Sequence, residues 1–457
     1  MDAAGVIGCF KDRSILITGS TGFLGKMLVE KILRVQPDVR KLYLIVRAAD
    51  AASAENRVLT EVVGTKLFDI YEEIHVIVSV AATTSFYERY DVALASNTLG
   101  VAHVCDLAKK CANLKILLHV STAFVAGEQE RLLVEKPLDA GKALRKDYSL
   151  DIQSELKLVE SVKSKLRVQF SNDKIEKRKM KELGLKRASH FGWPNVYSLT
   201  KALGKMLLGT LGRDLPVVIV RPSIISSTFK EPMPGWTEGS RTMDMLYVAY
   251  NDQKLQCFIF NRNVIIDVIP GDMVINAVMV AMALHWEKHG TQAIYHVTSG
   301  HRNPLRGSTF LESFYEYFHS NPRVTKDGRI VKHGRVTLFK KYTFFSLYMI
   351  LRYKLALEAF HVMSVFGHSL SHHYNKLNRG YKFLILIAKL YAPYAFFKGC
   401  FDDTSMKKLW AITATEELDD GSTFDCDPAC IDWGSYLINT HIPAALIYSE
   451  FSYYLFC

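Results

Sequence analysis

The sequence predicts an α/β protein with a doubly wound parallel sheet in its N-terminal half and a mainly helical C-terminal domain. In the first half, apolar runs rich in Ile, Leu and Val alternate with stretches of helical periodicity, which is typical of parallel strands joined by covering helices. Between residues 222 and 329 the pattern loosens into loops and short elements, and from Val336 onward it becomes helical, aromatic and cationic. The expected strands cover residues 14–19, 42–46, 75–82, 115–122 and 216–223, and the expected helices cover residues 23–35, 54–66, 92–110 and 197–211.

Length and composition are those of a globular protein with two domains. The 457 residues are 49% hydrophobic and 23% charged, which leaves ample material for a buried core. We expect one domain over residues 1–330, in which residues 222–330 face the substrate, and a second over residues 331–457. The apolar stretch 273–286 is too short to span a membrane and predicts a buried core helix.

The net charge and the cysteines limit the classes of partner. A net charge of +11 favours a phosphate-bearing cofactor or a membrane surface. Nucleic acid would suit the same charge, but the absence of zinc-finger spacing and of a basic region with heptads disfavours it. The eight cysteines include no CxxC pair and predict reduced thiols without a metal site.

A glycine-rich turn predicts a cofactor site between the first strand and the first helix. Such glycines allow a tight turn, close approach of the backbone to a diphosphate, and close helix packing, while the helix N-terminus favours negative charge. A glycine turn without a ligand is the plainer alternative, but the strand and helix on either side favour a Rossmann-type dinucleotide site. The residues assigned to this turn are Gly19, Thr21, Gly22, Phe23, Leu24 and Gly25.

Arg47 predicts NADP(H) rather than NAD(H). It stands at the end of the second strand, where NAD-dependent proteins have an acid that binds the ribose, and a guanidinium suits a 2′-phosphate instead. A solvated arginine at a strand end is the alternative. Further walls of the cofactor cleft are assigned to residues after the third and fifth expected strands, namely Ala81, Ala82, Thr83, Pro222 and Ser223.

Tyr197 and Lys201 form a YxxxK pattern on one face of a helix and are assigned to both catalysis and cofactor binding. An ammonium group beside a phenol stabilises the phenolate, so such a tyrosine serves as a general acid near neutral pH. The pattern alone is common, since Tyr394 and Lys398 repeat it far from any cofactor motif. The order of motifs favours Tyr197, because the glycine turn comes first, HVSTAF ends a strand next, and YxxxK follows.

Three polar side chains complete the predicted catalytic set. Thr122, with Ser121 as the competing choice, supplies the hydroxyl that holds a substrate carbonyl. Asn97 is a candidate for binding a proton-relay water, and a buried structural asparagine is an equally good interpretation.

With these motifs in order, the chain resembles the alcohol-forming fatty acyl-CoA reductases, most closely the plant branch, which is related to the male-sterility proteins. The resemblance spans nearly the whole chain. Its reductase part rests on ILITGSTGFLGKMLVEKILRVQP, AATTSFYERYDVAL, NTLGV, VSTAFVAGE, GWPNVYSLTKALGKMLL and IVRPSII. PGWTEGSRTMD and DVIPGDMVINA resemble substrate-side segments, and KFLILIAKLYAPYAFFKGCFDD with IDWGSYLINTHIP resembles the C-terminal sterile domain.

The resemblance implies that two NADPH reduce a long-chain fatty acyl-CoA to a fatty alcohol by way of an aldehyde. Tyr197 would donate the proton, Thr122 or Ser121 would orient the oxygen, and Lys201 would hold the ribose and the tyrosine. A sugar-nucleotide epimerase or dehydratase shares the glycine turn and YxxxK but not the sterile-like part. A paralogue impaired in cofactor binding, which binds lipid or a partner, is the non-enzymatic alternative.

The connection between Arg47 and His75 departs from the family pattern. Only 27 residues separate the two, enough for one helix, whereas the family has here a third strand and a loop that lines the adenine. Because that strand would lie at the sheet edge, we expect the fold to survive and the affinity for the cofactor to fall.

The C-terminal half predicts association with a membrane surface. Residues 337–366 interleave Phe, Tyr and Leu with lysines and arginines, as in helices that lie in a membrane interface, although packing on its own domain is the alternative. The N-terminus has neither a secretory signal nor a plastid transit pattern. We therefore expect peripheral binding to the cytosolic face of the endoplasmic reticulum membrane, or a cytoplasmic protein.

Two further charged clusters have plain interpretations. His368 and His372 lie near His361 and His373 without a partner at metal-ligand spacing, which predicts a solvated or interfacial cluster. Residues 172–187 hold seven basic and three acidic residues, which predicts a solvated helix face, with a landing site for CoA phosphates as the alternative.

Overall fold

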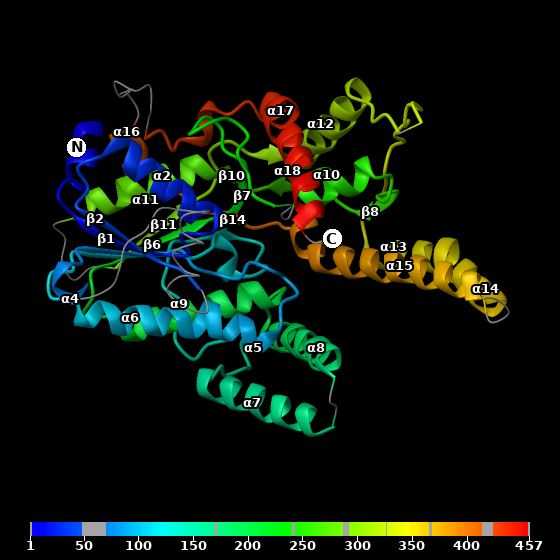
Figure 1. Cartoon of the computed structure of the whole chain (residues 1–457), viewed down its shortest axis with the longest axis horizontal. Coiled ribbons are helices and arrows are strands. Elements are labelled where there is room, and N and C mark those ends of the chain that lie inside the picture. Colours follow the sequence, from blue (N-terminus) through cyan, green and yellow to red (C-terminus); the bar gives the residue numbers. More distant parts are fainter. Residues whose placement is uncertain are drawn as a thin grey trace. The chain divides into compact units, whose positions relative to one another are not determined.

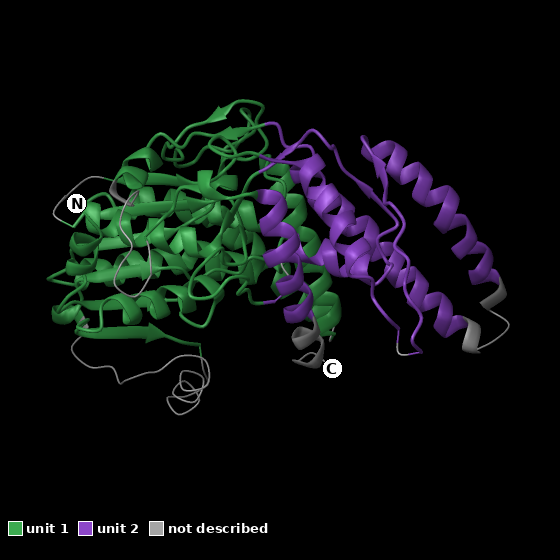
Figure 2. Cartoon of the chain, turned by 90° about the horizontal axis from the view of Figure 1, so that it is seen from above, with its two compact units in different colours: residues 1–238, 267–304, 399–432 green, residues 239–266, 305–398, 433–457 purple. Residues whose placement is uncertain are grey.

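The computed structural model describes residues 2–47, 70–169, 172–239, 243–286, 292–325, 327–364, 368–413 and 424–455. The chain forms two compact units (Figure 2). Unit 1 consists of Met1–Glu238, Asp267–Pro304 and Gly399–Asp432, and unit 2 consists of Gly239–Ile266, Leu305–Lys398 and Trp433–Cys457. This division differs from the expected single boundary near residue 330, because segments that are far apart in the sequence pack together in each unit.

A six-stranded parallel sheet forms the centre of unit 1, in the order β11-β6-β4-β3-β1-β2 (Figure 1). Because all strands run the same way, their carboxyl ends share one edge. The five expected strands are confirmed, and β11 is a sixth that the loosened pattern after residue 222 did not indicate. The strands are β1 (Ser14–Thr18), β2 (Lys41–Ile45), β3 (Val76–Ser79), β4 (Ile116–Val120), β6 (Val217–Pro222) and β11 (Ala293–Val297).

Helices cover both faces of this sheet, with α2 (Phe23–Val35) and α11 (Gly271–Leu284) on one side and α6 (Gly100–Lys110) and α9 (Val196–Leu211) on the other (Figure 1). The expected helices 23–35 and 197–211 are confirmed. Helix α11 is buried almost throughout, as predicted for a core helix. The expected helix 54–66 lies outside the described residues.

The expected helix 92–110 is confirmed, but it is longer and changes its winding. A short helix α5 (Tyr90–Ala93) continues through a π-helical segment η1 (Leu94–Leu99) into α6. Such π segments occur often at functional sites, and this one carries Asn97.

A pair of helices, α7 (Ile152–Gln169) and α8 (Asp173–Phe191), packs on α5 and α9. On α8 the buried residues Met180, Gly184, Ala188 and Phe191 recur every three or four positions and form one face. Five of the seven basic residues of 172–187 are exposed, in agreement with a solvated face. The exceptions are Lys181, which lies over the Tyr87 ring at 5.2 Å from its centroid, and Arg187, which binds the buried carboxylate of Glu155 on α7 with contacts of 2.9 and 2.5 Å.

Of the two outer strands of the sheet, β2 is more exposed than β11. Lys41 and Ile45 are exposed and the three residues between them are half-buried, whereas the innermost strands are fully buried. Among the described residues no strand pairs with the outer side of β2. This arrangement agrees with the expectation that the sheet forms without a further edge strand.

The other elements of unit 1 are short and lie around the sheet. Strand β5 (Leu132–Leu133) pairs with β14 (Cys400–Phe401), and β7 (Ile224–Ser226) pairs with β10 (Val268–Pro270). The remaining helical elements are α1 (Ala3–Gly8), α4 (Ile70–Glu73), η2 (Ala123–Ala126), α16 (Met406–Thr413) and η4 (Pro428–Cys430).

Unit 2 is mainly helical and has an aromatic core in which Tyr247 packs against Phe310 and Phe314. Its helices include α12, in the stretch where the sequence indicated loops. They are α10 (Asp244–Asn251), α12 (Gly307–Ser320), α13 (Tyr342–Met349), η3 (Ile350–Lys354), α14 (Leu355–Ser364), α15 (His368–Ala395), α17 (Trp433–Tyr436), η5 (Leu437–His441) and α18 (Ile442–Leu455). Its strands pair as β8 (Cys257–Ile259) with β13 (Thr337–Phe339) and β9 (Ile265–Ile266) with β12 (Leu305–Arg306).

Candidate active site

The glycine turn packs directly against the carboxyl end of β3. Gly19 has φ +73°, and a Cβ there would lie 2.7 Å from the Cα atom of Ala81. A Cβ on Gly25 would lie 2.1 Å from the carbonyl oxygen of Gly19. Thr18 accepts a hydrogen bond from the Ala81 N–H at 3.3 Å. The turn and the predicted wall at Ala81 are therefore neighbours, and side chains at these glycines would push them apart.

The start of α2 has no side-chain cap. Gly22 is the N-cap of the helix and has no side chain that could cap it. Gly22 is exposed, Thr21 and Leu24 are half-buried, and Phe23 is buried beneath them. The first-turn N–H groups and the helix dipole favour negative charge at this end.

Arg47 lies at the same edge of the sheet as the glycine turn. Its backbone is two residues beyond β2, and the register pairs Ile45 of β2 with Thr18 of β1. The side chain is exposed. A guanidinium at this place is close in register to the turn, which suits the predicted contact with a 2′-phosphate.

Tyr197 and Lys201 lie on the first two turns of α9, whose N-cap is Asn195. The ring of the half-buried Tyr197 stacks on Phe86, with 6.3 Å between the ring centroids. The Lys201 side chain is buried, and its Nζ donates to the carbonyl oxygen of Val120 at 2.8 Å. Burial lowers the pKa of Lys201 to about 8. Helix α9 is thereby joined to the carboxyl end of β4.

The two candidate hydroxyls after β4 have different surroundings. Thr122 caps η2 by accepting from the Phe124 N–H at 3.4 Å, and its hydroxyl donates to the Pro222 carbonyl at 3.3 Å. The Ser121 hydroxyl is buried and has no hydrogen-bond partner among the described residues. The structure brings both to the carboxyl end of β4, where Lys201 bonds the Val120 carbonyl.

Asn97 is bound on all sides by protein groups. Its Nδ2 donates to the Thr83 carbonyl and to the Thr200 hydroxyl, both at 3.0 Å, and its Oδ1 accepts from the Thr83 N–H at 2.9 Å. Both amide hydrogens are thus committed. These bonds favour the structural interpretation, in which Asn97 holds the predicted wall at Thr83 against α9. Its role with a relay water stays a prediction.

Two side chains near Tyr197 and Lys201 of α9 were not singled out from the sequence. Phe86 stacks on Tyr197, and His119 on β4 bonds Ser79 through Nδ1 at 3.2 Å. Burial and the nearby Lys201 charge lower the pKa of His119, so its imidazole is neutral. Phe86 lies inside the motif AATTSFYERY, and His119 directly precedes VSTAF. These motifs could have drawn attention to the two residues, but neither motif by itself predicts a contact with α9.

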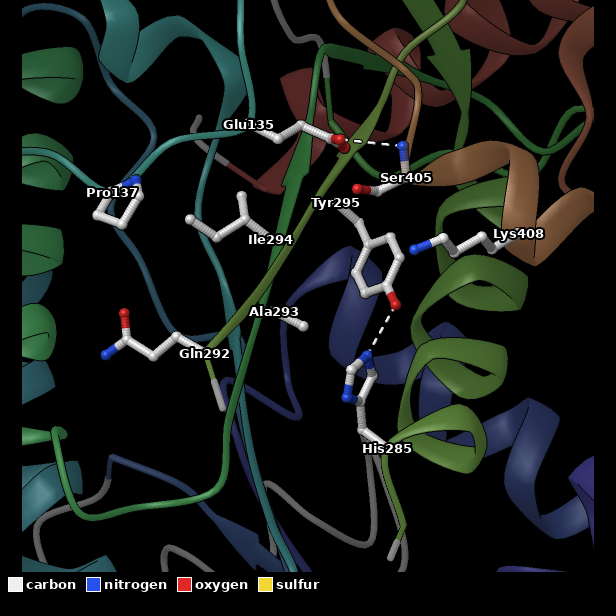
Figure 3. A pocket seen from close by; sticks show the side chains of 9 residues that line it. All are labelled: Glu135, Pro137, His285, Gln292, Ala293, Ile294, Tyr295, Ser405 and Lys408. Carbon is white, nitrogen blue, oxygen red and sulfur yellow. Dashed lines mark hydrogen bonds between the residues drawn. The ribbon is translucent and has the colours of Figure 1, made fainter. Parts of the chain in front are cut away.

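A cavity of about 290 Å³ lies elsewhere, at the amino-terminal end of β11 (Figure 3). His285 and Tyr295 bond each other at 2.7 Å in it, and the Lys408 side chain points toward Tyr295. The predicted catalytic residues lie at the carboxyl ends of the strands, so this cavity is separate from them.

The histidines near α15 and the second YxxxK pattern lie apart from the candidate site residues in the sequence. The described ranges hold no group of three His, Cys, Asp or Glu side chains that could bind a metal ion. His361 stacks on Tyr374, with 4.4 Å between the ring centroids. Lys398, the partner of Tyr394 in the second YxxxK, lies beyond the end of α15, so those two residues do not share a helix.

Family models match most of the chain. The NAD-binding model of the male sterility proteins matches residues 17–73 and 65–278, and the sterile model of the same proteins matches residues 355–449. The first match is split within residues 65–73, inside the shortened connection.

Known proteins resemble the chain over nearly its full length. The alcohol-forming fatty acyl-CoA reductase of Simmondsia chinensis is 40% identical over 98% of this chain and 99% of its own. Two solved structures share the fold: the terminal R domain of the myxalamid biosynthetic pathway (16% identity, 99% and 95% of the two chains, TM-score 0.51) and UDP-glucuronic acid 4-epimerase of Bacillus cereus in complex with NAD (12% identity, 95% and 99%, TM-score 0.50).

Proposed function

Because the chain belongs to the male sterility protein family of fatty acyl-CoA reductases, we propose that it reduces a long-chain fatty acyl-CoA to the primary fatty alcohol with NADPH. The likeness to an alcohol-forming reductase over nearly the whole of both chains carries this proposal. The epimerase alternative loses support, since its likeness is 12% identical and concerns the fold alone.

The residues of the glycine turn fit a dinucleotide. The exposed backbone at Gly22 and the N-terminus of α2 would receive the diphosphate, and Ala81, Ala82 and Thr83 would form the adjoining wall. Pro222 ends β6 and Ser223 follows it at the carboxyl ends of the strands, and Thr122 bonds the Pro222 carbonyl. NADPH, when bound, supplies a hydride.

Tyr197 is the proposed general acid. It would donate its phenolic proton to the carbonyl oxygen as that oxygen gains charge, first on the thioester and again on the aldehyde. The protonated tetrahedral hemithioacetal then breaks its C–S bond and releases CoA thiol, so that each of the two reductions uses one hydride and one proton. The buried Lys201 ammonium would stabilise the phenolate that remains, because a charge interacts more strongly where water is excluded.

The hydroxyl of Thr122 or Ser121 would orient the carbonyl oxygen. Thr122 is held in place by its two hydrogen bonds, whereas Ser121 is buried and has a hydroxyl to offer. Substituting each in turn separates the two, since the residue that holds the substrate lowers kcat when it becomes alanine and the other leaves kcat nearly unchanged.

The direct test of the reaction is incubation with NADPH and a panel of saturated acyl-CoAs of different chain length, with mass analysis of the products. Tyr197→Phe is the matched control, because it removes the acid and keeps the ring on Phe86. We expect alcohol from the unmodified chain and a loss of about 10²–10⁴-fold in the variant. Near-normal turnover by Tyr197→Phe would remove this mechanism.

A cofactor-impaired paralogue remains a second candidate, favoured by one observation, the shortened connection between Arg47 and His75. Calorimetry with NADPH separates the two functions before any assay of activity. No measurable binding at millimolar NADPH would support the paralogue and contradict the reductase.

We further propose that unit 2 binds a membrane surface peripherally, with the endoplasmic reticulum membrane as the expected location. Residues 337–398 hold nine Lys and Arg against the single acid Glu358. Large apolar side chains more than half exposed follow one another at helical spacing there: Phe344, Leu347, Leu351 and Leu355. In the part of the chain that the structure describes, no helix is both long and apolar enough to cross a bilayer.

Vesicle flotation tests this association. The unmodified chain should float with vesicles that contain anionic lipid and should float less with purely zwitterionic ones. Lys340→Glu with Lys341→Glu should reduce flotation, whereas the control pair Lys109→Glu with Lys110→Glu, two exposed lysines at the end of α6, should not. Equal effects of the two pairs would show a dependence on net charge alone and contradict the proposed surface.

A further inference from the structure

The segment from Thr228 to Glu238, here called the 228–238 loop, closes on itself after β7. The Thr228 N–H donates to the Trp236 carbonyl at 3.0 Å, and the Gly235 N–H donates to the Thr228 carbonyl at 3.0 Å. The Thr228 hydroxyl accepts from the Trp236 N–H at 2.8 Å and donates to the Met233 carbonyl at 2.5 Å. These bonds give the loop a shape of its own, with Trp236 at its closing end.

One buried carboxylate fixes the first half of this loop to α11. Asp272, in the first turn of that helix, accepts the backbone N–H groups of Phe229 at 2.8 Å, Lys230 at 2.7 Å and Glu231 at 3.1 Å. Burial raises the pKa of Asp272, and the three N–H bonds act in the opposite direction by stabilising its charge. Three converging donors leave this part of the loop little freedom to move.

Three cations of α2 hold the loop from the other side. Lys31, buried at 2% exposure, and Arg34 both form ion pairs with Glu231, and Lys26 pairs with Glu238 at 3.1 Å. Glu231 thus meets the C-terminal half of α2 and Glu238 meets its first turn, so the loop runs along this helix toward the glycine turn. The same pairs neutralise the cations, so the N-terminal N–H groups of α2 rather than these side chains are the groups offered to a ligand.

Trp236 lies at the functional end of α2. Its ring meets that of Phe23 edge to face, with 5.8 Å between the ring centroids and 83° between the planes. Phe23 is the first residue of α2 after Gly22 and is buried, whereas Trp236 is half-buried and keeps accessible surface beside this helix end. An aromatic ring thus stands next to the place assigned to the cofactor diphosphate.

We propose that the 228–238 loop is a preformed wall of the dinucleotide site on its diphosphate side, that Trp236 contacts the bound dinucleotide, and that Asp272 is the positioning residue of this wall. The inference rests on the proposed use of NADPH. A wall that is already fixed in the free protein loses little conformational entropy on binding, which raises affinity. The 228–238 loop, which belongs to the segment expected to face the substrate, is also bound to α2, the helix proposed to receive the cofactor.

Calorimetry on the full chain with three ligands tests the wall. NADPH and 2′-phospho-ADP-ribose contain the diphosphate, and adenosine 2′-monophosphate does not. Trp236→Ala and Asp272→Asn should each weaken the first two ligands about tenfold and the third less than twofold. Trp286→Ala is the matched control, since Trp286 follows α11 at the opposite end from Asp272 and should change none of the three.

Other outcomes would overturn the wall. Equal weakening of all three ligands would show a general loss of structure, and an unchanged NADPH affinity with weaker binding of coenzyme A would assign Trp236 to the substrate instead. Should Trp236→Ala fail to fold, Trp236→Phe keeps the contact with Phe23 and should weaken NADPH by about threefold. If the unmodified chain binds none of the ligands, the proposed cofactor falls as well; if it binds them and Trp236→Ala binds equally, only the wall falls.

Discussion

The two outer strands of the sheet end in different ways. At β11 the half-buried carboxylate of Glu135 accepts the backbone N–H of His296 at 2.7 Å and that of Ser405 at 3.0 Å. At β2 the strand is half-exposed, and the carboxylate of Glu73 accepts from the Lys41 and Tyr43 side chains at 2.7 and 2.6 Å rather than from the backbone of the strand. The outer strand β11 lies four strands away from β1, which precedes the glycine turn, whereas the outer strand β2 is the direct neighbour of β1.

This difference teaches where a change in the sequence can be tolerated. Behind β11 the guanidinium of Arg221 bonds the Lys136 carbonyl at 2.6 Å and the imidazole of His296 at 3.1 Å, and burial lowers its pKa to about 9. A deletion there would leave several buried polar groups without partners. The shortened connection instead follows the half-exposed strand β2, so we expect its cost to fall on ligand binding more than on folding.

The largest expected effect is on stability, at Glu135 beside the outer strand β11. Glu135→Ala removes the acceptor of two backbone N–H groups and a negative charge that acts on the buried Arg221, which costs about 2–4 kcal/mol in the free energy of unfolding. Urea denaturation measures it, with Glu130→Ala as a control at an exposed acid of the same segment. A loss below about 1 kcal/mol would mean that the edge does not depend on this carboxylate.

A smaller effect, on cofactor affinity, is expected from Arg47, which follows the outer strand β2. If the guanidinium binds the 2′-phosphate, Arg47→Ala removes a charge-assisted contact of about 1.5–3 kcal/mol. NADPH should then bind about tenfold or more weakly, while NADH binding stays nearly the same. Titration with both cofactors decides this, and an equal loss for the two would make Arg47 merely structural.

The pH dependence contrasts the exposed Arg47 with the buried Lys201. Because burial lowers the pKa of Lys201 to about 8, its ammonium is present below that pH and is lost as the pH rises through it. We expect kcat/KM to fall about tenfold per pH unit above pH 8. Arginine keeps its charge throughout this range, so the preference for NADPH over NADH should not change with it.

Lys201→Arg provides the check on this assignment. The variant should lose the alkaline fall in kcat/KM, even though its overall rate is lower. A profile of the unmodified chain that stays level to pH 9.5 would show that Lys201 does not titrate in the free enzyme.

The smallest expected effect is on cofactor affinity and comes from lengthening the connection that follows β2. Grafting the longer segment of the Simmondsia chinensis relative between Phe68 and Tyr71 should strengthen NADPH binding about fivefold, or about 1 kcal/mol. The midpoint of thermal unfolding should change little, because the edge strand adds few buried contacts to the core. If the graft left NADPH affinity unaltered and raised the stability strongly, the connection after β2 would matter for folding rather than for ligand binding, contrary to our expectation.

The sequence by itself determined the local elements and the order of the motifs. Helix 23–35 follows from its apolar periodicity and from the glycines before it, and the structure has it at Phe23–Val35. YxxxK was placed on a helix by spacing alone, and Tyr197 and Lys201 lie on α9. Such features depend on neighbours within one or two helical turns, which a sequence displays directly.

Tertiary structure alone decided which distant groups meet. The Asn97 amide is committed to Thr83 and Thr200, and Asp272 gathers three N–H groups from a loop some 40 residues earlier. Strand β11 and the two interleaved units were likewise not expected from the sequence. Buried polar groups must find hydrogen-bond partners wherever the fold brings them, and no local periodicity encodes a partner that lies a hundred residues away.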